Sequence, residues 1–490
     1  TRIRSVFFLA KKCFSVYNRS DAIFIIMEEF MDKIELLKSR RAALLDCGRD
    51  IREKIASLTD DKSFVELDAY SFSHNDFYGE DAQGEGVITG YATVDGVPVY
   101  VVAQNVKVLS GGVSRANCLK IKKCLDKAYE TEYPVVYLFD SLGVQVGEGV
   151  NVLEGIADVI ASSCDLKGLV PQFSVVLGKL YGSFAVLAAG ADYNFMLEGS
   201  RAAYASPLVI SAADGKNLSD EAVAGVKASA KNSLTTFAVK DLAEVKATIA
   251  DILSVLPEYS GSVVDTDDDF NRVTESLNEA VCPGCLVKSV FDDKKMIELN
   301  KEFCPEVATG IGRVGGMSVA AVVFGGGEDG VELTNEVIDK ISDFAAYANR
   351  NGLPLLTFVN TLGIKADLET SNSTILKKIY GLSEILNGAK RLSVVYGKAV
   401  GLGYTLFASK SLGVGYAYAF ANAKIGLFNG AATSVAFGEV REDKLSELEE
   451  RYSEENADPI NAAKNGYIDN IIEPQFVRSY VISALQTIVR

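Results

Sequence analysis

The sequence feature that most constrains the fold is a glycine turn that occurs twice. The first copy, Val175-Val176-Leu177-Gly178-Lys179, leads through Gly182 into small residues, and the second, Val394-Val395-Tyr396-Gly397-Lys398, leads to Gly401. An apolar, β-branched run predicts a buried strand, and the segment after the glycine predicts a closely packed helix. Such a turn aims backbone N–H groups and the positive end of a helix at one point, which stabilises negative charge. Two copies about 220 residues apart indicate a duplicated domain.

Strand and helix patterns alternate in both halves of the 490 residues. Two equivalent apolar runs, 134–140 and 354–360, lack polar alternation and predict strands that are buried on both faces. We therefore expect an α/β protein with two tandem domains of the same kind. The Ser-, Gly- and Asp-rich stretch 257–269 places the boundary, giving an N-terminal domain of residues 27–260 and a C-terminal domain of residues 261–490.

The first 26 residues are interpreted as a separate extension, either disordered or non-native. Their short apolar patches are interrupted by charged residues and have the pattern of neither a signal peptide nor a membrane helix. We expect their deletion to leave solubility and assembly unchanged. From Met27 to about Ser57, apolar residues at helical spacing predict a helical arm that lies on the domain surface or on a partner subunit.

Composition excludes several classes of function. The formal net charge of −16 argues against nucleic acid as a partner. His74 is the one histidine and lies in the polar stretch 71–76, which predicts a surface loop. Ser-His-Asp and Cys-His hydrolases and most zinc enzymes are therefore disfavoured, and no metal is expected. The chemistry must depend on backbone donors, carboxylates, lysine, tyrosine or a cofactor.

The eight cysteines are scattered, mostly in apolar surroundings such as those of Cys118 and Cys124. This pattern predicts reduced thiols in a cytoplasmic protein, with no disulfide framework. Cys282-Pro283-Gly284-Cys285 is a single CxxC with no second pair, so structural zinc is only a minor alternative there.

A glycine loop at 325–330 suggests a rival interpretation. Gly325-x-Gly327-x-x-Gly330 has the spacing of a dinucleotide-binding loop. The acidic residue expected about 20 positions later, at the end of the next strand, is absent, because that strand ends at Asn360. A dinucleotide site is therefore disfavoured.

Several short motifs follow one another along the chain in a fixed order. They are Ser63–Asp68, Gly84–Tyr91, Asp140-Ser141-x-Gly143, Glu148-Gly149-Val150, the two glycine turns, Thr309-Gly310 and a C-terminal segment from Ala462 to Pro474. In this order and spacing they resemble the carboxyltransferase subunits of biotin-dependent acyl-CoA carboxylases and decarboxylases, the family of propionyl-CoA carboxylase β and methylmalonyl-CoA decarboxylase α. The resemblance runs from about Met27 to the last residues.

The resemblance implies two tandem crotonase-like (ClpP/crotonase) domains. It also implies a homo-oligomer, usually a hexamer, in which the N-terminal domain of one subunit faces the C-terminal domain of another. Acyl-CoA would lie on the N-terminal domain and carboxybiotin on the C-terminal domain. Because the chain has no biotin-attachment motif, the biotin would be on a separate carrier protein. A biotin carboxylase or a membrane decarboxylase subunit is a further implied partner, so the protein is expected in the cytoplasm or peripheral to a membrane complex.

The family mechanism holds the acyl-CoA enolate and the biotin enolate in one oxyanion hole each, and biotin N1 is the base. A single oxyanion donor contributes roughly 100- to 1000-fold in rate. By resemblance, the catalytic donors map onto Gly182 and Ser183 in the first turn and onto Gly401, Leu402 and Gly403 in the second. The substrate-binding positions are Gly111, Gly112, Ser141, Gly143 and Gly363.

The chain also departs from the family pattern. The family commonly has Gly-Gly-Ala-Arg where this chain has Leu142-Gly143-Val144-Gln145, and its paired glycines become Gly182-Ser183 and Gly401-Leu402. Two alternatives therefore stay open: a non-catalytic scaffold subunit of such a complex, and a biotin-independent crotonase-type acyl-CoA enzyme. For the basic helix face of Arg115, Lys120, Lys122 and Lys123, a solvated surface is preferred over contact with CoA phosphates. The acyl group and the direction of the reaction stay undetermined.

Overall fold

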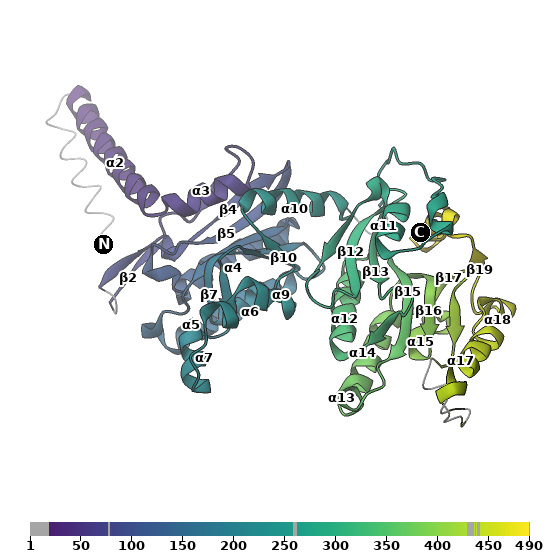
Figure 1. The fold of residues 1–490 in the computed structure, drawn as a ribbon. Coiled ribbons are helices and arrows are strands. Elements are labelled where there is room, and N and C mark those ends of the chain that lie inside the picture. The colour runs from purple at the N-terminus through teal and green to yellow at the C-terminus, as the bar shows by residue number, and fades with distance from the viewer. Residues whose placement is uncertain are drawn as a thin grey trace.

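The computed structural model describes residues 19–76, 79–257, 262–428, 436, 438 and 442–489. Two large sheets lie side by side, one built from each half of the chain (Figure 1). We call the parts around these sheets the N-terminal domain and the C-terminal domain. Helix α2 extends away from the N-terminal sheet, and α10 runs over that sheet toward the second domain (Figure 1).

The sheet of the N-terminal domain has the order β1-β4-β5-β6-β7-β8-β10, and β9 pairs with β7. Its strands are β1 Val65–Leu67, β4 Val87–Val94, β5 Val97–Gln104, β6 Val135–Ser141, β7 Gln172–Tyr181, β8 Tyr193–Leu197, β9 Arg201–Ala203 and β10 Phe237–Val239, with β2 Phe72–Asn75 and β3 Glu80–Gln83 forming a separate hairpin. The helices of this domain are α2 Arg19–Cys47, α3 Arg49–Leu58, α4 Arg115–Thr131, α5 Val150–Asp165, α6 Ser183–Gly190, α7 Pro207–Asp214, α8 Asp220–Ala224, α9 Val226–Lys231 and α10 Leu242–Val255.

The sheet of the C-terminal domain has the order β11-β12-β13-β15-β16-β17-β19, with β14 on β15 and β18 on β16. Its strands are β11 Met296–Leu299, β12 Val307–Val314, β13 Met317–Phe324, β14 Val331–Leu333, β15 Leu355–Ile364, β16 Arg391–Val400, β17 Val414–Phe420, β18 Lys424–Gly426 and β19 Asn470–Ile472. The helices are α11 Pro283–Val290, α12 Asn335–Arg350, α13 Leu368–Ser371, α14 Ile375–Asn387, α15 Leu402–Phe407, α17 Glu442–Asn456, α18 Pro459–Lys464 and α19 Val477–Ile488.

The two sheets share one construction. Each begins with three antiparallel strands, β1-β4-β5 or β11-β12-β13, and continues with parallel strands. The register shifts at the same place in both, between Phe139 and Ser141 where β6 meets β7, and between Val359 and Thr361 where β15 meets β16. The prediction of two α/β domains of the same kind is confirmed by this matching order.

Local chemistry explains the helices that flank the sheets. Ser114 caps α4, since its Oγ accepts the Asn117 N–H at 2.9 Å, and Thr334 caps α12 in the same way through Val337 at 3.3 Å. The apolar face predicted for α4 is buried, at Cys118, Ile121, Leu125 and Ala128. These helices therefore lie where the capping residues and the apolar spacing place them.

One hydrophobic core crosses the boundary between the domains. A single cluster of buried side chains includes Phe173 and Tyr193 of the N-terminal sheet together with Val337 and Tyr347 of α12. The hydroxyls of Tyr193 and Tyr347 are hydrogen-bonded to each other, and their rings pack edge to face with centroids 5.8 Å apart. The two sheets are thus joined by packed side chains as well as by the chain.

The structure corrects the bounds of one predicted element and the type of another, and it supports the rejection of the dinucleotide loop. The arm expected from Met27 to Ser57 is two helices, α2 and α3, and α2 already begins at Arg19; residues 1–18 lie outside the described range. His74 lies in strand β2, paired with β3, and not in a loop. The glycines of 325–330 lead into strand β14 and not into a helix, which removes the dinucleotide interpretation.

Candidate active site

The first glycine turn joins β7 to α6. Gly182 has φ 87°, a conformation that favours glycine, and its N–H donates to Ala203 O of β9 at 3.2 Å. At the start of α6, the Ala185 N–H donates to Gly182 O at 3.0 Å. The N–H groups of Ser183 and Phe184 come earlier in the helix and have no acceptor within it. The turn therefore presents peptide donors at the positive end of a helix.

The second turn repeats this construction between β16 and α15. Gly401 has φ 55°, and its N–H donates to Gly426 O of β18 at 3.0 Å, just as Gly182 bonds β9. The Thr405 N–H donates back to Gly401 O at 3.3 Å. The N–H groups of Leu402 and Gly403 consequently begin the helix without an acceptor inside it. Both turns thus form where the sequence predicted them, but the N–H groups of Gly182 and Gly401, which were counted among the predicted donors, are already bonded to β9 and β18.

The structure brings together the four substrate-binding positions predicted in the N-terminal domain. The Gly143 N–H donates to Ser141 Oγ at 3.2 Å, and Gly143 O accepts the Val113 N–H at 2.9 Å. A Cβ on Gly111 would lie 2.2 Å from Asp140 O, so only glycine fits there. A Cβ on Gly182 would lie 3.8 Å from Gly143 Cα, which places the first turn against this loop.

A cavity of about 470 Å³ opens beside this loop. Its lining residues are Val106, Lys107, Leu109, Ser110, Gly112, Leu142, Gly143, Val144, Gln145 and Val146. The volume is in the range of a small-molecule site, and the lining combines apolar side chains with a few polar groups. Gly112 and Gly143, both predicted from the sequence, belong to this lining.

The equivalent place in the C-terminal domain is built from Gly363, Gly403 and Thr361. The Gly363 N–H donates to Thr361 Oγ1 at 3.2 Å, and a Cβ on Gly403 would lie 2.5 Å from Thr361 Cγ2. An adjacent cavity of about 610 Å³ is lined by Ile364, Lys365, Ala366, Asp367, Leu368, Thr370, Ser371, Ile375 and Leu376. The two cavities share no lining residue, so within one chain the predicted sites form two separate groups.

Sequence reasoning missed the residue pair that fixes both turns. Asp140 Oδ1 accepts the Lys179 N–H at 3.1 Å, and Asn360 Oδ1 accepts the Lys398 N–H at 2.9 Å. A Cβ on Gly178 would lie 2.6 Å from Asp140 Oδ1, and a Cβ on Gly397 would lie 2.3 Å from Asn360 Oδ1. The sequence does contain a signal for this pair. The same four-residue pattern, a polar residue, a hydroxyl residue, any residue and glycine, occurs at both 140–143 and 360–363.

Comparison with known proteins identifies the family. Residues 46–490 match the family model described as the carboxyl transferase domain. The chain belongs to the carboxyl transferase family. The resemblance predicted from the sequence motifs is therefore confirmed.

Individual members of the carboxyl transferase family align over almost the whole chain. This chain is 29% identical to the propionyl-CoA carboxylase carboxyltransferase subunit of Haloferax mediterranei, and the alignment covers 94% of this chain and 96% of that one. It is 28% identical to methylmalonyl-CoA decarboxylase subunit alpha of Veillonella parvula, with the same coverage of both chains. The solved transcarboxylase 12S hexamer, with methylmalonyl-coenzyme A and methylmalonic acid bound, superposes with a TM-score of 0.86 at 22% identity, covering 94% of this chain and 96% of that one. This last likeness shows the fold.

Gln145 stands at the position where the carboxyl transferase family commonly has arginine. Its side chain is buried, and a Cβ on Gly112 would lie 2.3 Å from Gln145 Nε2. Among the lining residues of the N-terminal cavity, Lys107 is the one charged side chain. Nearby, Gln104 Oε1 accepts the Asp140 N–H at 3.2 Å, so a neutral amide helps to position this loop.

The predicted solvated basic face on α4 is wrong for Lys120. This residue is 5% exposed, and its Nζ donates to Gly84 O at 3.0 Å and to Val87 O at 2.6 Å. Burial lowers the pKa of Lys120 to about 8. The other three cations pair with acidic side chains: Arg115 with Asp158, Lys122 with Asp126, and Lys123 with Asp68. The α4 cations thus give no support for CoA phosphate contact.

A third cavity, of about 510 Å³, lies between α10 and strands β11 and β12, away from the loops of Gly143 and Gly363. Its lining includes Asp251, Asp265, Asp267, Asp292 and Asp293 and only two basic residues. This acidic lining repels an anionic substrate, so the two glycine-turn cavities are the better candidates.

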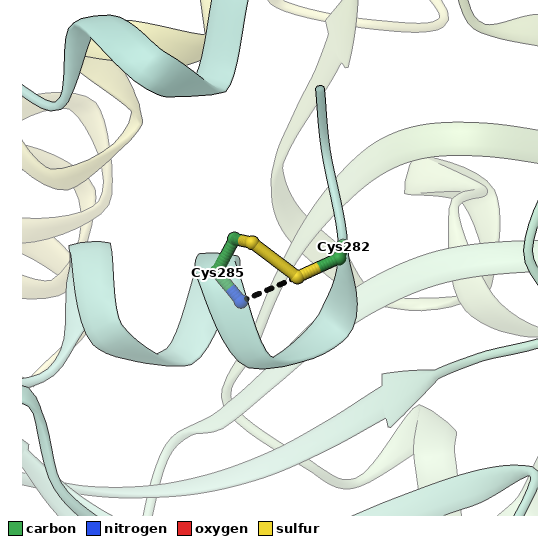
Figure 2. The surroundings of a disulfide bond; sticks show 2 residues. All are labelled: Cys282 and Cys285. Carbon is green, nitrogen blue, oxygen red and sulfur yellow. Dashed lines mark hydrogen bonds between the residues drawn. A yellow bond between two sulfur atoms is a disulfide. The ribbon is translucent and has the colours of Figure 1, made fainter. Parts of the chain in front are cut away.

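The prediction of reduced cysteines holds for some residues and fails for others. Cys118 and Cys124 are free and buried, as expected. Cys282 and Cys285 are joined in a disulfide at the start of α11, which corrects the prediction of reduced thiols there (Figure 2). Among the described residues, no group of three or more metal-ligating side chains occurs.

Proposed function

We propose that the chain is the catalytic carboxyltransferase subunit of a biotin-dependent acyl-CoA carboxylase or decarboxylase. It moves a carboxyl group between carboxybiotin and an acyl-CoA of the acetyl- or propionyl-CoA type. The observation that carries this proposal is the duplicated glycine turn in a member of the carboxyl transferase family, with a cavity beside each copy. We assign both domains to the crotonase-like fold, with the division between residues 27–260 and 261–490.

The N-terminal turn is assigned to the acyl-CoA. The thioester oxygen becomes negatively charged when the α-carbon is deprotonated, and the N–H groups of Ser183 and Phe184, which have no acceptor within the helix, are assigned to this charge. The positive end of α6 adds to this stabilisation. The apolar side chains Leu142 and Val146 at the cavity suit a short acyl chain. The relatives named for propionyl-CoA and methylmalonyl-CoA support this class of substrate.

The C-terminal turn is assigned to biotin. The cavity beside Gly363 has aliphatic walls, Ile364, Leu368 and Ile375, which suit an apolar bicyclic ring. The peptide donors at the start of α15 lie next to Gly363, since a Cβ on Gly403 would lie 3.5 Å from the Gly363 nitrogen. When bound, biotin supplies the carboxyl group and a ring nitrogen that accepts the substrate proton. The N–H groups of Leu402 and Gly403 hold the ureido oxygen, and the aliphatic walls exclude water.

Rigidity of both turns supports a catalytic role. Asp140 and Asn360 fix the strand ahead of each turn, and β9 and β18 hold the glycine N–H groups. Donors held in place before the reaction cost no reorganisation when charge develops.

A complete site requires further components. The two turns lie in different domains and their cavities share no residue, so we propose a homo-oligomer, a hexamer by analogy, in which the N-terminal domain of one copy meets the C-terminal domain of another. Exposed apolar side chains support such a contact, including Leu208 at 81%, Leu368 at 76% and Leu376 at 70% exposure. The remaining partners are a biotin carboxyl carrier protein and a biotin carboxylase or membrane decarboxylase subunit.

Location follows from the partner. No helix in the described part of the chain is long and apolar enough to span a membrane. We propose a cytoplasmic protein, which would be peripheral to the membrane if its partner is a membrane decarboxylase subunit.

The test separates the two turns. Ser183→Trp crowds the acyl-CoA side and should weaken binding of propionyl-CoA or malonyl-CoA in calorimetry, with Val186→Trp on the exposed face of α6 as control. Gly401→Val should spare CoA-ester binding but reduce decarboxylation of malonyl-CoA or methylmalonyl-CoA with free biotin by roughly 100-fold or more. Gly466→Val is its control, because Gly466 also has a positive φ but a Cβ added there would contact no other atom.

One set of residues favours a second candidate function, the non-catalytic scaffold. Gln145 replaces the family's usual arginine, and Leu402, at 40% exposure, replaces a glycine in the second turn. A wild-type protein that binds no acyl-CoA and transfers no carboxyl group to any biotin acceptor would establish the scaffold. Acyl-CoA turnover without biotin would instead establish the biotin-independent crotonase-type enzyme.

A further inference from the structure

We propose that the Cys282–Cys285 disulfide is a thiol–disulfide exchange site, reduced by a protein or small molecule that carries a dithiol. The pair is the one disulfide found in the described part of the chain, where Cys47, Cys118, Cys124, Cys164 and Cys304 are free. This proposal does not depend on the proposed carboxyl transfer.

The position of the pair favours exchange. Cys282 is the N-cap residue of α11, and Pro283 begins the helix (Figure 2). The Cys285 N–H donates to Cys282 Sγ at 3.0 Å, and Figure 2 draws this bond beside the disulfide. A thiolate at Cys282 would accept the same bond and face the positive end of the helix. The helix start thus stabilises the reactive form of this sulfur.

Exposure distinguishes the two sulfurs. Cys282 is exposed, whereas Cys285, in the first turn of α11, is half-buried. An external thiolate therefore reaches Cys282 first, and Cys285 is the leaving group.

The bond does little to hold the fold together. It joins residues three positions apart, and the entropy that a disulfide removes from the unfolded chain is smallest for so short a loop. Other contacts hold α11: Leu286 and Val290 are fully buried, Arg272 donates to Ser289 O at 2.9 Å, and Arg478 donates to Val290 O. The helix is therefore anchored at its C-terminal end, and the disulfide can open without moving it.

The site is remote from the catalytic turn of its own domain. Asp292, just after α11, accepts the N–H groups of Gly315 and Gly316 at 3.0 and 2.8 Å, in the turn between β12 and β13. That turn leads into the amino end of the parallel strand β13, whereas Gly401 follows the carboxyl end of β16. Figure 1 shows α11 and α15 at opposite ends of the sheet. Opening the disulfide should therefore leave the glycine turns unchanged.

The exchange is balanced as follows. A thiolate of the dithiol reductant attacks Cys282 Sγ, the Cys282–Cys285 bond breaks, and its electron pair leaves on Cys285 Sγ, which takes up a proton. The second thiolate of the reductant attacks its own sulfur in the mixed disulfide and releases Cys282 as a thiolate. The reductant becomes a disulfide, and two electrons pass to the Cys282–Cys285 pair.

The test uses the full chain, isolated in air without reductant. N-ethylmaleimide is added without denaturant, before and after incubation with reduced thioredoxin, and the cysteine-containing peptides are weighed by mass spectrometry. We expect the 282–285 peptide to be unlabelled before reduction and doubly labelled after it. Labelling before reduction, or none after it unless the chain is denatured, would overturn the proposal.

Variants assign the roles of the two sulfurs. Cys285→Ser should react with a disulfide reagent, 5,5′-dithiobis(2-nitrobenzoic acid), at least about 10-fold faster at position 282 than Cys282→Ser does at position 285. Equal rates would contradict the assignment. Cys164→Ser is the matched control, because Cys164 is an exposed free cysteine, and it should leave labelling of the 282–285 peptide unchanged. Thermal unfolding of each variant checks that it is folded.

Discussion

Asp140 and Asn360 occupy equivalent positions in the two domains, and each accepts the backbone N–H of the lysine that precedes its glycine turn. The other terminal atom of the two side chains differs, because Asp140 has a second oxygen where Asn360 has the amide nitrogen Nδ2. Asn360 Nδ2 donates to Gly325 O at 2.8 Å and to Gly327 O at 2.7 Å, so the amide also fixes the glycine loop after β13. A carboxylate at this position would face two carbonyl oxygens.

We therefore expect Asn360→Asp to lower the free energy of unfolding by about 1–3 kcal/mol, because a buried carboxylate would lose both donors. Asp140→Asn keeps the acceptor for Lys179 and should change stability much less. Urea unfolding of the two variants measures the difference. Equal losses at the two positions would contradict the role given to the Asn360 amide.

Gly111 tests whether the loop behind the first turn shapes the N-terminal cavity. In Gly111→Ala the new Cβ would lie 2.2 Å from Asp140 O, at φ 68°, so the backbone must move. Acyl-CoA affinity should fall by about 10-fold or more, because small displacements of positioning groups are costly. Gly96→Ala is the control: its φ is 79°, but the Cβ would contact nothing. Calorimetric titration that finds the same affinity in both variants would count against the site.

The buried Lys120 makes stability depend on pH in a definite direction. Its pKa falls from 10.5 to about 8, chiefly because burial penalises the charged form. Below pH 8 both states hold the proton, and between about pH 8 and 10.5 the unfolded state holds more protons than the folded state. Stability from this group therefore rises with pH across that window, by at most about 3 kcal/mol.

Comparison with Lys120→Met isolates this contribution, since other lysines and tyrosines titrate in the same range. Urea unfolding from pH 7 to pH 10.5 should show wild type gaining stability relative to the variant as the pH rises. A difference that stays constant or shrinks over this range would refute the assignment.

Assembly is the fourth prediction. Leu208→Asp and Leu376→Asp place a charge on apolar side chains that are 81% and 70% exposed in the single chain. Each should shift sedimentation velocity toward smaller species without loss of folding, because burying an unpaired charge at an interface is costly. Val97→Asp, on the hairpin of the N-terminal sheet, is the control and should assemble normally. A wild-type protein that is monomeric at micromolar concentration and fully active would refute the oligomer.

The parts of the structure that sequence predicted are those decided by neighbouring residues. Ser114 caps its helix through Asn117, and the φ of Gly182 follows from a strand that must turn at once into a helix. Lys120 could not be predicted in this way: its position among basic residues indicates a surface, but its acceptors Gly84 and Val87 come from a segment more than 30 positions away.

The candidate site shows the same division. The glycines were found because close backbone approach leaves a residue-type signal, as at Gly111 and Gly403. The repeated pattern at 140–143 and 360–363 marks Asp140, but its contact with the Lys179 N–H was missed because that contact depends on the register between β6 and β7. The start of α11 was misjudged for a different reason, since the sequence spacing of Cys282 and Cys285 is the same in a dithiol and in a disulfide.

The tyrosine pair that joins the two sheets has a consequence for how the chain unfolds. Tyr193 and Tyr347 belong to one continuous buried cluster, so separating the halves would expose apolar surface and leave one unpaired hydroxyl in each of them. The duplicated halves should consequently melt in a single cooperative transition, and a polypeptide ending near residue 260 should aggregate. Two domains that share one construction are thus thermodynamically a single unit.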